Sequence, residues 1–295
     1  MIRSFQTFAR DIKLSHSIFA LPFALLAMFL AAGSMTRLPT WIEALLILWC
    51  MFTARTFAMA TNRWADRKLD AANPRTAGRA IPSGQLSPWF VFLMMILCAI
   101  GFVAGCAGFI PNLNPWPLVL SPLVLFWLAF YSFAKRFTWL CHVILGIALA
   151  ISPLAAAIAI EPAYLKEAPV YLLVLMVATW VAGFDIIYAL QDVEVDRQSG
   201  LYSMPSRLGE RKALWISRGL HVVSLIALVS LWNLERQLGL LFFIGVVIVA
   251  GLLILEHALV WGSKTGRINM AFFTVNGVIS LLLGLLGIID VLMAR

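Results

Sequence analysis

Apolar residues dominate the chain in long runs that are separated by short polar stretches. A helix needs about 20 apolar residues to cross the roughly 30 Å of hydrocarbon in a bilayer. Nine runs approach this length, at residues 17–35, 41–61, 88–110, 117–134, 138–160, 168–190, 213–233, 238–260 and 270–292. The pattern predicts an all-α membrane protein with nine transmembrane helices around a central cavity.

The composition supports this class. Of the 295 residues, 62% are hydrophobic and only 12% are charged, whereas about 25% of the residues in an average soluble domain are charged. The longest polar stretch, roughly residues 62–87, carries motifs and does not resemble a linker. We therefore expect a single integral-membrane domain over residues 1–295.

The formal net charge of +8 is distributed in a way that argues against nucleic acid as a partner. With nine spans, seventeen Lys and Arg residues fall at the N-terminus and in the loops on one side, against four on the other side. Cytoplasmic loops carry such an excess. The sequence therefore predicts a protein of the bacterial cytoplasmic membrane with its N-terminus inside and its C-terminus outside. The lipid bilayer is its expected surrounding, and no obligate protein partner is indicated.

Two acidic clusters interrupt the apolar pattern, and both fall on the predicted cytoplasmic side. Their members are Asn62, Asp66 and Asp70 in the first cluster and Asp185, Tyr188, Asp192 and Asp196 in the second. Aspartates four residues apart lie on one face of a helix. Because ionised carboxylates repel each other and are costly to desolvate, the clusters predict a bound cation between them. Carboxylate and amide ligands without Cys or clustered His favour Mg²⁺ or Mn²⁺, with a diphosphate bound to the metal.

Basic residues accompany these clusters. Arg75 and Arg79 lie in a Pro- and Gly-containing loop, where a guanidinium fork suits phosphate oxygens, although ordinary loop charge is the alternative. Arg55 lies within the second apolar run, where a charge normally faces a polar cavity. Lys135 follows Tyr131 by one turn and could either bind a ligand or extend to the lipid headgroups. Metals and arginines together favour the departure of a diphosphate leaving group.

These motifs resemble the UbiA superfamily of intramembrane aromatic prenyltransferases over nearly the whole chain. The matching features are the nine runs, N-x3-D-x3-D after the second, Y-S-x2-K-R after the fourth and D-x2-Y-A-x2-D-x3-D after the sixth. The resemblance implies roles for thirteen residues: Mg²⁺ binding by Asn62, Asp66, Asp70, Asp192 and Asp196; diphosphate contacts by Arg55, Arg75, Arg79, Lys135 and Arg136; and places near the reacting prenyl and acceptor groups for Tyr131, Asp185 and Tyr188. Asp185 is the candidate base or acceptor-orienting group.

The expected reaction is transfer of a polyprenyl group from polyprenyl diphosphate to an aromatic acid in quinone biosynthesis. A 4-hydroxybenzoate-type acceptor is the first hypothesis. The pair Asn62-Arg63 departs from the Asn-Asp of many such enzymes and resembles relatives in menaquinone biosynthesis, whose acceptor is a dihydroxynaphthoate. Haem, chlorophyllide and homogentisate are other acceptors in the family.

Two other classes of membrane protein also carry charged residues in their helices. A secondary transporter typically places its charges near mid-membrane, whereas here they cluster at helix ends. A metal-dependent phosphatidyltransferase concentrates its aspartates in one signature.

His142 could line a cavity, but a packing or interfacial role is the favoured interpretation of this residue.

Overall fold

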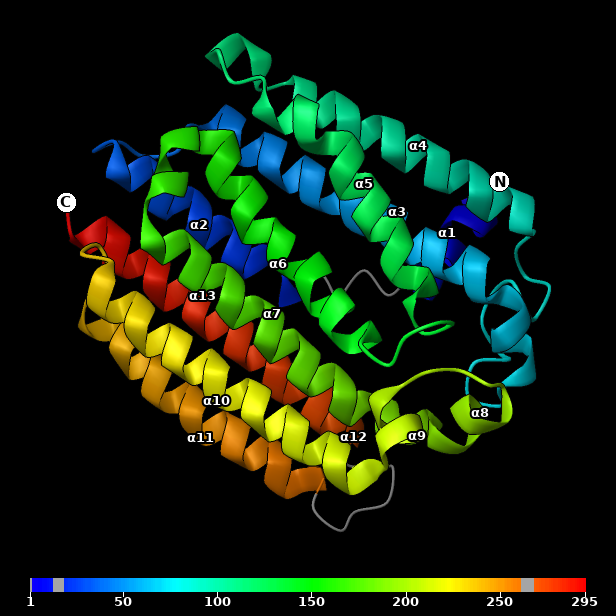
Figure 1. The fold of residues 1–295 in the computed structure, drawn as a ribbon. Coiled ribbons are helices and arrows are strands. Elements are labelled where there is room, and N and C mark those ends of the chain that lie inside the picture. The colour runs from blue at the N-terminus through cyan, green and yellow to red at the C-terminus, as the bar shows by residue number, and fades with distance from the viewer. Residues whose placement is uncertain (1, 13–18, 261–267) are drawn as a thin grey trace.

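The computed structural model describes residues 2–12, 19–260 and 268–295, and every regular element within these ranges is helical (Figure 1). In the described residues, eight helices are long and apolar enough to cross a membrane. They are α3 (Trp41–Ala72), α4 (Pro88–Ala107), α5 (Trp116–Ala134), α6 (Cys141–Ile160), α7 (Ala168–Ala189), α10 (Glu210–Leu234), α11 (Leu240–Val260) and α13 (Asn276–Met293). The predicted all-helical membrane fold is confirmed.

The first predicted span differs from the other eight. Helix α2 covers Leu21–Ser34, only 14 residues, and is apolar but shorter than a full crossing. Pro22 lies in its first turn, where proline favours a helix start, and Thr36 beyond its end has a positive φ of 55°. The count of nine helices is therefore approximate. Residues 17 and 18 of this predicted span, and the counted basic residues Lys13, Lys264 and Arg267, lie outside the described ranges.

Shorter elements connect the long helices. They are α1 (Ile2–Asp11), the 3-10 turns η2 (Ile110–Asn112), η3 (Pro162–Lys166) and η4 (Leu190–Asp192), the helices α8 (Val193–Gln198), α9 (Met204–Leu208) and α12 (Ile268–Met270), and the π-helical turn η6 (Ala271–Val275). The η4 turn interrupts the second acidic cluster, so this cluster does not lie on one continuous helix.

The long helices form two groups that flank a central layer (Figure 1). Helices α3, α4 and α5 pack together on one side, and α10, α11 and α13 lie on the other. Between them, α7 packs against both α6 and α10, and α2 packs against α6 and α13. Aromatic residues such as Phe23, Trp180 and Phe242 fill the main core.

Large apolar side chains also cover the outer surface of the bundle. Trp41, Phe126 and Ile254 are each more than half exposed, as are many neighbours on the outward faces of α3, α5 and α11. A soluble protein rarely exposes so large an apolar surface. The arrangement is that of an integral membrane protein whose helices face lipid.

Helix α3 carries the first acidic cluster beyond the apolar part of the bundle. It begins with a capping box, in which Thr40 accepts the Glu43 backbone N–H and Glu43 accepts that of Thr40. Its 32 residues, at about 1.5 Å per residue, are longer than the roughly 30 Å of membrane hydrocarbon. It ends at Ala72, because Pro74 disfavours helical backbone at Asn73. Its polar last turns therefore project at one end of the bundle.

Candidate active site

The first acidic cluster forms a stripe along the last turns of α3. Asn62 donates a hydrogen bond from Nδ2 to Asp66 Oδ2 at 3.2 Å. Asp66 is 1% exposed and Asp70 is 4% exposed, so both carboxylates are removed from bulk water. Burial of two like charges requires cations nearby.

Basic side chains supply this charge. Lys135 Nζ lies 3.2 Å and Arg136 Nη2 2.9 Å from the oxygens of Asp66, and both residues follow the end of α5. Arg79 Nη1 donates to Asp70 Oδ1 at 2.6 Å from the loop that follows α3. The tip of α3 therefore meets both the loop that directly follows it and the end of α5, which lies 70 positions away in the sequence.

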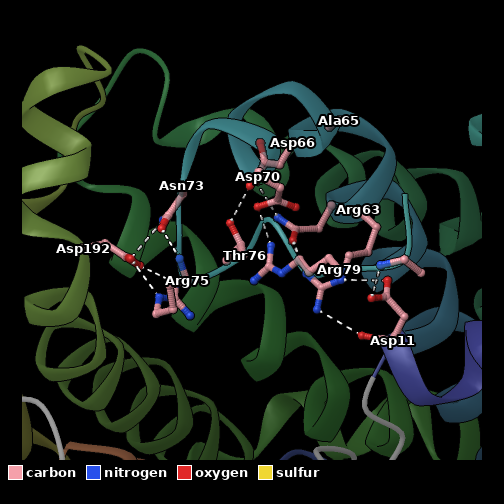
Figure 2. A network of polar contacts seen from close by, with 12 residues as sticks. Asp11, Arg63, Ala65, Asp66, Asp70, Asn73, Arg75, Thr76, Arg79 and Asp192 are labelled. Atoms are coloured by element: carbon pink, nitrogen blue, oxygen red, sulfur yellow. Dashed lines mark hydrogen bonds and ion pairs between the residues drawn. The ribbon is translucent and has the colours of Figure 1, made fainter. Parts of the chain in front are cut away.

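The loop after α3 also joins the two acidic clusters (Figure 2). Arg75 donates to Asp192 from Nε at 2.9 Å and also from Nη2, and its Nη1 donates to Tyr188 Oη at 3.2 Å. Asn73 Nδ2 donates to Asp192 Oδ1 at 3.2 Å. Burial lowers the pKa of Arg75, but the hydrogen bonds and charge of Asp192 outweigh it and raise that pKa above its ordinary value. Arg75 is therefore a permanent cation between the clusters.

Both clusters open on one cavity of about 230 Å³ at the polar end of the bundle. Eleven of the thirteen residues predicted from the sequence line it: Asn62, Asp66, Asp70, Arg75, Arg79, Tyr131, Lys135, Asp185, Tyr188, Asp192 and Asp196. We call this space the reaction cavity. The sequence prediction that the two clusters face each other is thus matched by the geometry, and the individual roles of these residues stay predictions.

Two of the predicted residues are placed differently. Arg136 does not itself line the reaction cavity but reaches it through its hydrogen bond with Asp66. Arg55 points from the middle of α3 toward the end of α1, where its Nη1 donates to the Ile12 carbonyl at 3.4 Å. Arg63, whose identity raised the question of the acceptor, also lies outside the lining and turns toward Asp11.

The donor set of the reaction cavity fits a hard divalent cation. Among the described residues, no three His, Cys, Asp or Glu side chains converge into a complete metal cage. Mg²⁺ does not need such a cage, because one or two carboxylates with water and phosphate oxygens suffice. Asp70 Oδ2 is buried without a hydrogen-bond partner, and so is free to accept one more ligand. Carboxylates of both clusters and the Asn62 amide are therefore suited to hold Mg²⁺ together with a phosphate group.

His142 is a cavity residue that the sequence analysis favoured as a packing residue. It lies in the first turn of α6, and its Nδ1 is 2.7 Å from Asp185 Oδ2. The Met204 backbone N–H donates to Nε2 at 3.3 Å. Because a backbone N–H can only donate, Nε2 carries the lone pair and Nδ1–H donates to Asp185. The sequence held one signal for this role, a polar side chain at the start of an apolar helix. The partner of His142, Asp185, is 43 positions away, so the sequence pattern did not connect the two residues.

Comparison with known proteins places this geometry in a family. The model of the UbiA prenyltransferase family matches residues 20–278, which is most of the chain. The chain belongs to the UbiA prenyltransferase family. This membership confirms the resemblance found in the sequence and makes the protein an enzyme that transfers prenyl groups, so the transporter and phosphatidyltransferase alternatives are set aside.

Family relatives resemble the chain over most of its length. A 4-hydroxybenzoate octaprenyltransferase from Citrobacter koseri is 31% identical over 252 residues, covering 83% of this chain and 82% of the relative. The enzyme of the same name from Aliivibrio fischeri is 28% identical over 258 residues, covering 85% and 84%.

Solved structures of UbiA homologues share the fold. The apo structure of a homologue from Aeropyrum pernix superposes with a TM-score of 0.84 at 31% identity and covers 94% of this chain and 98% of its own. A homologue from Archaeoglobus fulgidus, bound to DMAPP and Mg²⁺, superposes with a TM-score of 0.71 at 19% identity and covers 97% and 99%. The latter likeness concerns the fold alone.

Proposed function

We propose that the protein transfers a polyprenyl group from polyprenyl diphosphate to the ring of a hydroxyaryl carboxylate in quinone biosynthesis, with 4-hydroxybenzoate as the acceptor. The observation that carries this proposal is that both aspartate clusters open on the same cavity. Four basic or phenolic residues also line this cavity: Arg75, Arg79, Tyr131 and Lys135. The two named relatives at 28% and 31% identity support this acceptor.

The proposed metal ligands are the oxygen donors of both clusters: Asn62, Asp66, Asp70, Asp192 and Asp196. This set favours Mg²⁺, and Mn²⁺ prefers the same kind of donor. When bound, the ion supplies positive charge for the oxygens of the leaving diphosphate. The Mg²⁺ present in the Archaeoglobus fulgidus structure supports this choice.

The proposed diphosphate contacts come from Arg55, Arg75, Arg79, Lys135 and Arg136. Arg75, Arg79 and Lys135 line the reaction cavity and hold the head of the donor directly, while its apolar tail lies among the helices. Arg136 acts through its hydrogen bond with Asp66, and Arg55 would have to turn from the Ile12 carbonyl to reach the diphosphate. As the C1–O bond of the allylic donor breaks, the diphosphate leaves with the bonding electron pair. These cations stabilise the charge that develops on its oxygens.

The proposed chemistry on the acceptor uses Tyr131, Asp185 and Tyr188. Tyr131 lies near the allylic C1, and the apolar walls keep water from the cation that forms there. The electron-rich acceptor ring then forms the new bond to C1. The proton of the attacked ring carbon passes to a carboxylate oxygen of Asp185, which restores aromaticity, while the His142 Nδ1–H keeps this carboxylate in place.

The proposed topology is one membrane domain over residues 1–295 in the bacterial cytoplasmic membrane. Helix α1, the last turns of α3 and helix α8 lie at one end of the bundle, and the C-terminus lies at the opposite end (Figure 1). The last turns of α3 and helix α8 carry Asp66, Asp70 and Asp196, which line the reaction cavity. The seventeen to four distribution of basic residues supports a cytoplasmic cavity and an external C-terminus.

A dihydroxynaphthoate acceptor in menaquinone biosynthesis is the second candidate. The observation in its favour is Asn62-Arg63 followed by Asp70-Ala-x-Asn-Pro-Arg-Thr76. This candidate keeps the donor, the metal and the reaction class and changes only the aromatic ring.

One incubation tests donor and acceptor together. Purified protein in lipid nanodiscs receives Mg²⁺, a labelled polyprenyl diphosphate and either 4-hydroxybenzoate or 1,4-dihydroxy-2-naphthoate, and the product mass is measured. Prenylated 4-hydroxybenzoate is the expected product. Prenylated dihydroxynaphthoate selects the second candidate, and no prenylated product with either acid contradicts both.

A further inference from the structure

Arg63 holds the N-terminal helix against the loop that follows α3. Its Nε lies 3.2 Å from Asp11 Oδ2, and its Nη2 donates to the Asp11 carbonyl oxygen at 3.2 Å. Asp11 Oδ1 in turn accepts the Ala80 backbone N–H at 3.0 Å. Figure 2 shows this group beside Arg79, away from the contact between Arg75 and Asp192. The end of α1, the α3 helix and the loop are thereby joined.

A second cavity, of about 240 Å³, lies at this junction. Among the described residues, its lining includes four arginines, Arg10, Arg63, Arg75 and Arg79, and one carboxylate, that of Asp11. Thr76 lies in its wall as well. Three of these arginines are paired with carboxylates, Arg63 with Asp11, Arg75 with Asp192 and Arg79 with Asp70. Four guanidinium groups thus face three carboxylates, and the remaining positive charge attracts anions. We call this space the arginine cavity.

Arg63 shows that this cavity is more than a surface patch of basic residues. The residue is 5% exposed, and its Nε makes no hydrogen bond despite its proximity to Asp11. The ion pair with Asp11 at 3.2 Å therefore compensates the burial of this guanidinium only in part, because its Nε–H is not aligned with the carboxylate. The Arg63 side chain lines the arginine cavity, so an anion bound there would add a second negative partner for its guanidinium group.

The arginine cavity and the reaction cavity share one wall. Arg75, Thr76 and Arg79 line both spaces from the loop after α3. On the reaction side their partners are the carboxylates of Asp192 and Asp70. On the other side, Arg75, Thr76 and Arg79 line the arginine cavity together with Arg63 and Arg10. An anion that passes from the reaction cavity to the arginine cavity therefore leaves a space rich in aspartates and enters one rich in arginines.

We propose that the arginine cavity is a second binding site for phosphate groups, and that during turnover it takes up the released pyrophosphate on its way to the cytoplasm. The first part stands on the cavity itself, and the assignment to product release rests on the proposed function. A lipid headgroup carries the same phosphate chemistry and is therefore the competing ligand that the experiment has to distinguish from pyrophosphate.

Direct binding measurements test the site without turnover. Protein in nanodiscs of phosphatidylcholine, with EDTA to remove divalent cations, is titrated calorimetrically with inorganic pyrophosphate. In EDTA the aspartates of the reaction cavity disfavour a polyanion, so the arginine cavity is the expected site of saturable binding. Arg63→Gln should weaken this binding roughly tenfold, as for the loss of one charge-assisted hydrogen bond.

Two matched variants separate charge from damage to the fold. Arg67→Gln removes the same charge one turn along α3, where Arg67 stacks 4.6 Å from the Trp64 ring and lines neither cavity, so its affinity should equal that of the wild type. Asp11→Asn keeps an oxygen for the Ala80 N–H and removes the opposing carboxylate, so it should tighten pyrophosphate binding severalfold. Structural damage would instead weaken binding in Asp11→Asn as it does in Arg63→Gln.

The outcomes separate this site from the proposed function. Absence of saturable binding, equal affinities in Arg63→Gln and Arg67→Gln, or weaker binding in Asp11→Asn overturns the arginine cavity as a phosphate site, even if prenyl transfer is found. Absence of prenyl transfer with retained binding overturns the proposed function and with it the assignment to product release, and leaves the phosphate site standing. Repeating the titration in phosphatidylglycerol nanodiscs identifies the source of the bound phosphate group. Unchanged affinity supports pyrophosphate as the ligand. Loss of binding shows that a lipid headgroup fills the arginine cavity and overturns the product-release assignment.

Discussion

Replacement of His142 by phenylalanine tests whether the histidine holds Asp185 in its working position. The histidine side chain is 4% exposed and that of Asp185 is 21% exposed, so the 2.7 Å hydrogen bond between them is largely screened from water. A hydrogen bond to a charged group contributes about 1.5–3 kcal/mol. If this energy fixes the carboxylate for the proton transfer, its loss lowers kcat by roughly ten- to a hundredfold.

The assay measures kcat and both KM values of the purified variants in nanodiscs. Because His142 lies against Asp185 and not against the cations at the tip of α3, we expect His142→Phe to lower kcat and to leave the KM for polyprenyl diphosphate unchanged. His142→Asn serves as the rescue variant, because its Nδ2 can donate in place of the ring Nδ1, and it should restore most of kcat. A folded His142→Phe protein with the kcat of the wild type would refute this reasoning.

Further predictions concern contacts away from the reaction cavity. Tyr164 donates to Glu235 Oε2 at 2.6 Å, so Tyr164→Phe should destabilise the fold by about 1–3 kcal/mol without changing kcat, as measured by thermal unfolding and turnover. Burial, and after it the charge of Glu235, raises the pKa of Tyr164 above its ordinary value of 10.0. The folded state therefore holds this proton more tightly than the unfolded state, and the stability of the wild type should fall as the pH rises above about 10. This pH dependence should be weaker in Tyr164→Phe. Asn276 donates to Glu256 Oε1 and accepts from Trp180 Nε1, each at 2.7 Å; Asn276→Ala leaves both groups without this buried partner and should lower the unfolding temperature by several degrees. An unchanged unfolding temperature in either variant would contradict the corresponding contact.

The long apolar runs were sufficient to predict the helices, because burial in lipid imposes the same length on each of them. The motif on α3 was equally accessible, since residues four apart share a helix face whatever the surrounding fold. The first run was misjudged in length, because Pro22 starts α2 inside it and the chain turns at Thr36. Hydropathy averages over a window and does not locate such ends.

Contacts between distant segments were beyond the sequence patterns. The reach of Arg75 to Asp192 depends on how the loop after α3 folds back, and no periodicity encodes that path. The contact of Arg63 with Asp11 was hidden in the same way. Because Arg63 follows Asn62 by one residue, its side chain points about 100° further around the helix and contacts Asp11 instead of the reaction cavity. His142 was undervalued for a similar reason, since a lone histidine acquires meaning only beside its partner.

The most direct test of the central claim is turnover by Asp66→Ala and Asp192→Ala, one variant from each cluster, with saturating Mg²⁺ and polyprenyl diphosphate. Glu194→Ala is the matched control, because this carboxylate lies two residues from Asp192 but is 76% exposed and lines neither cavity. Both aspartate variants should be inserted and folded but inactive, and Glu194→Ala should retain the wild-type rate. Prenyl transfer at the wild-type rate by either folded aspartate variant would contradict a shared metal and diphosphate site between the two clusters.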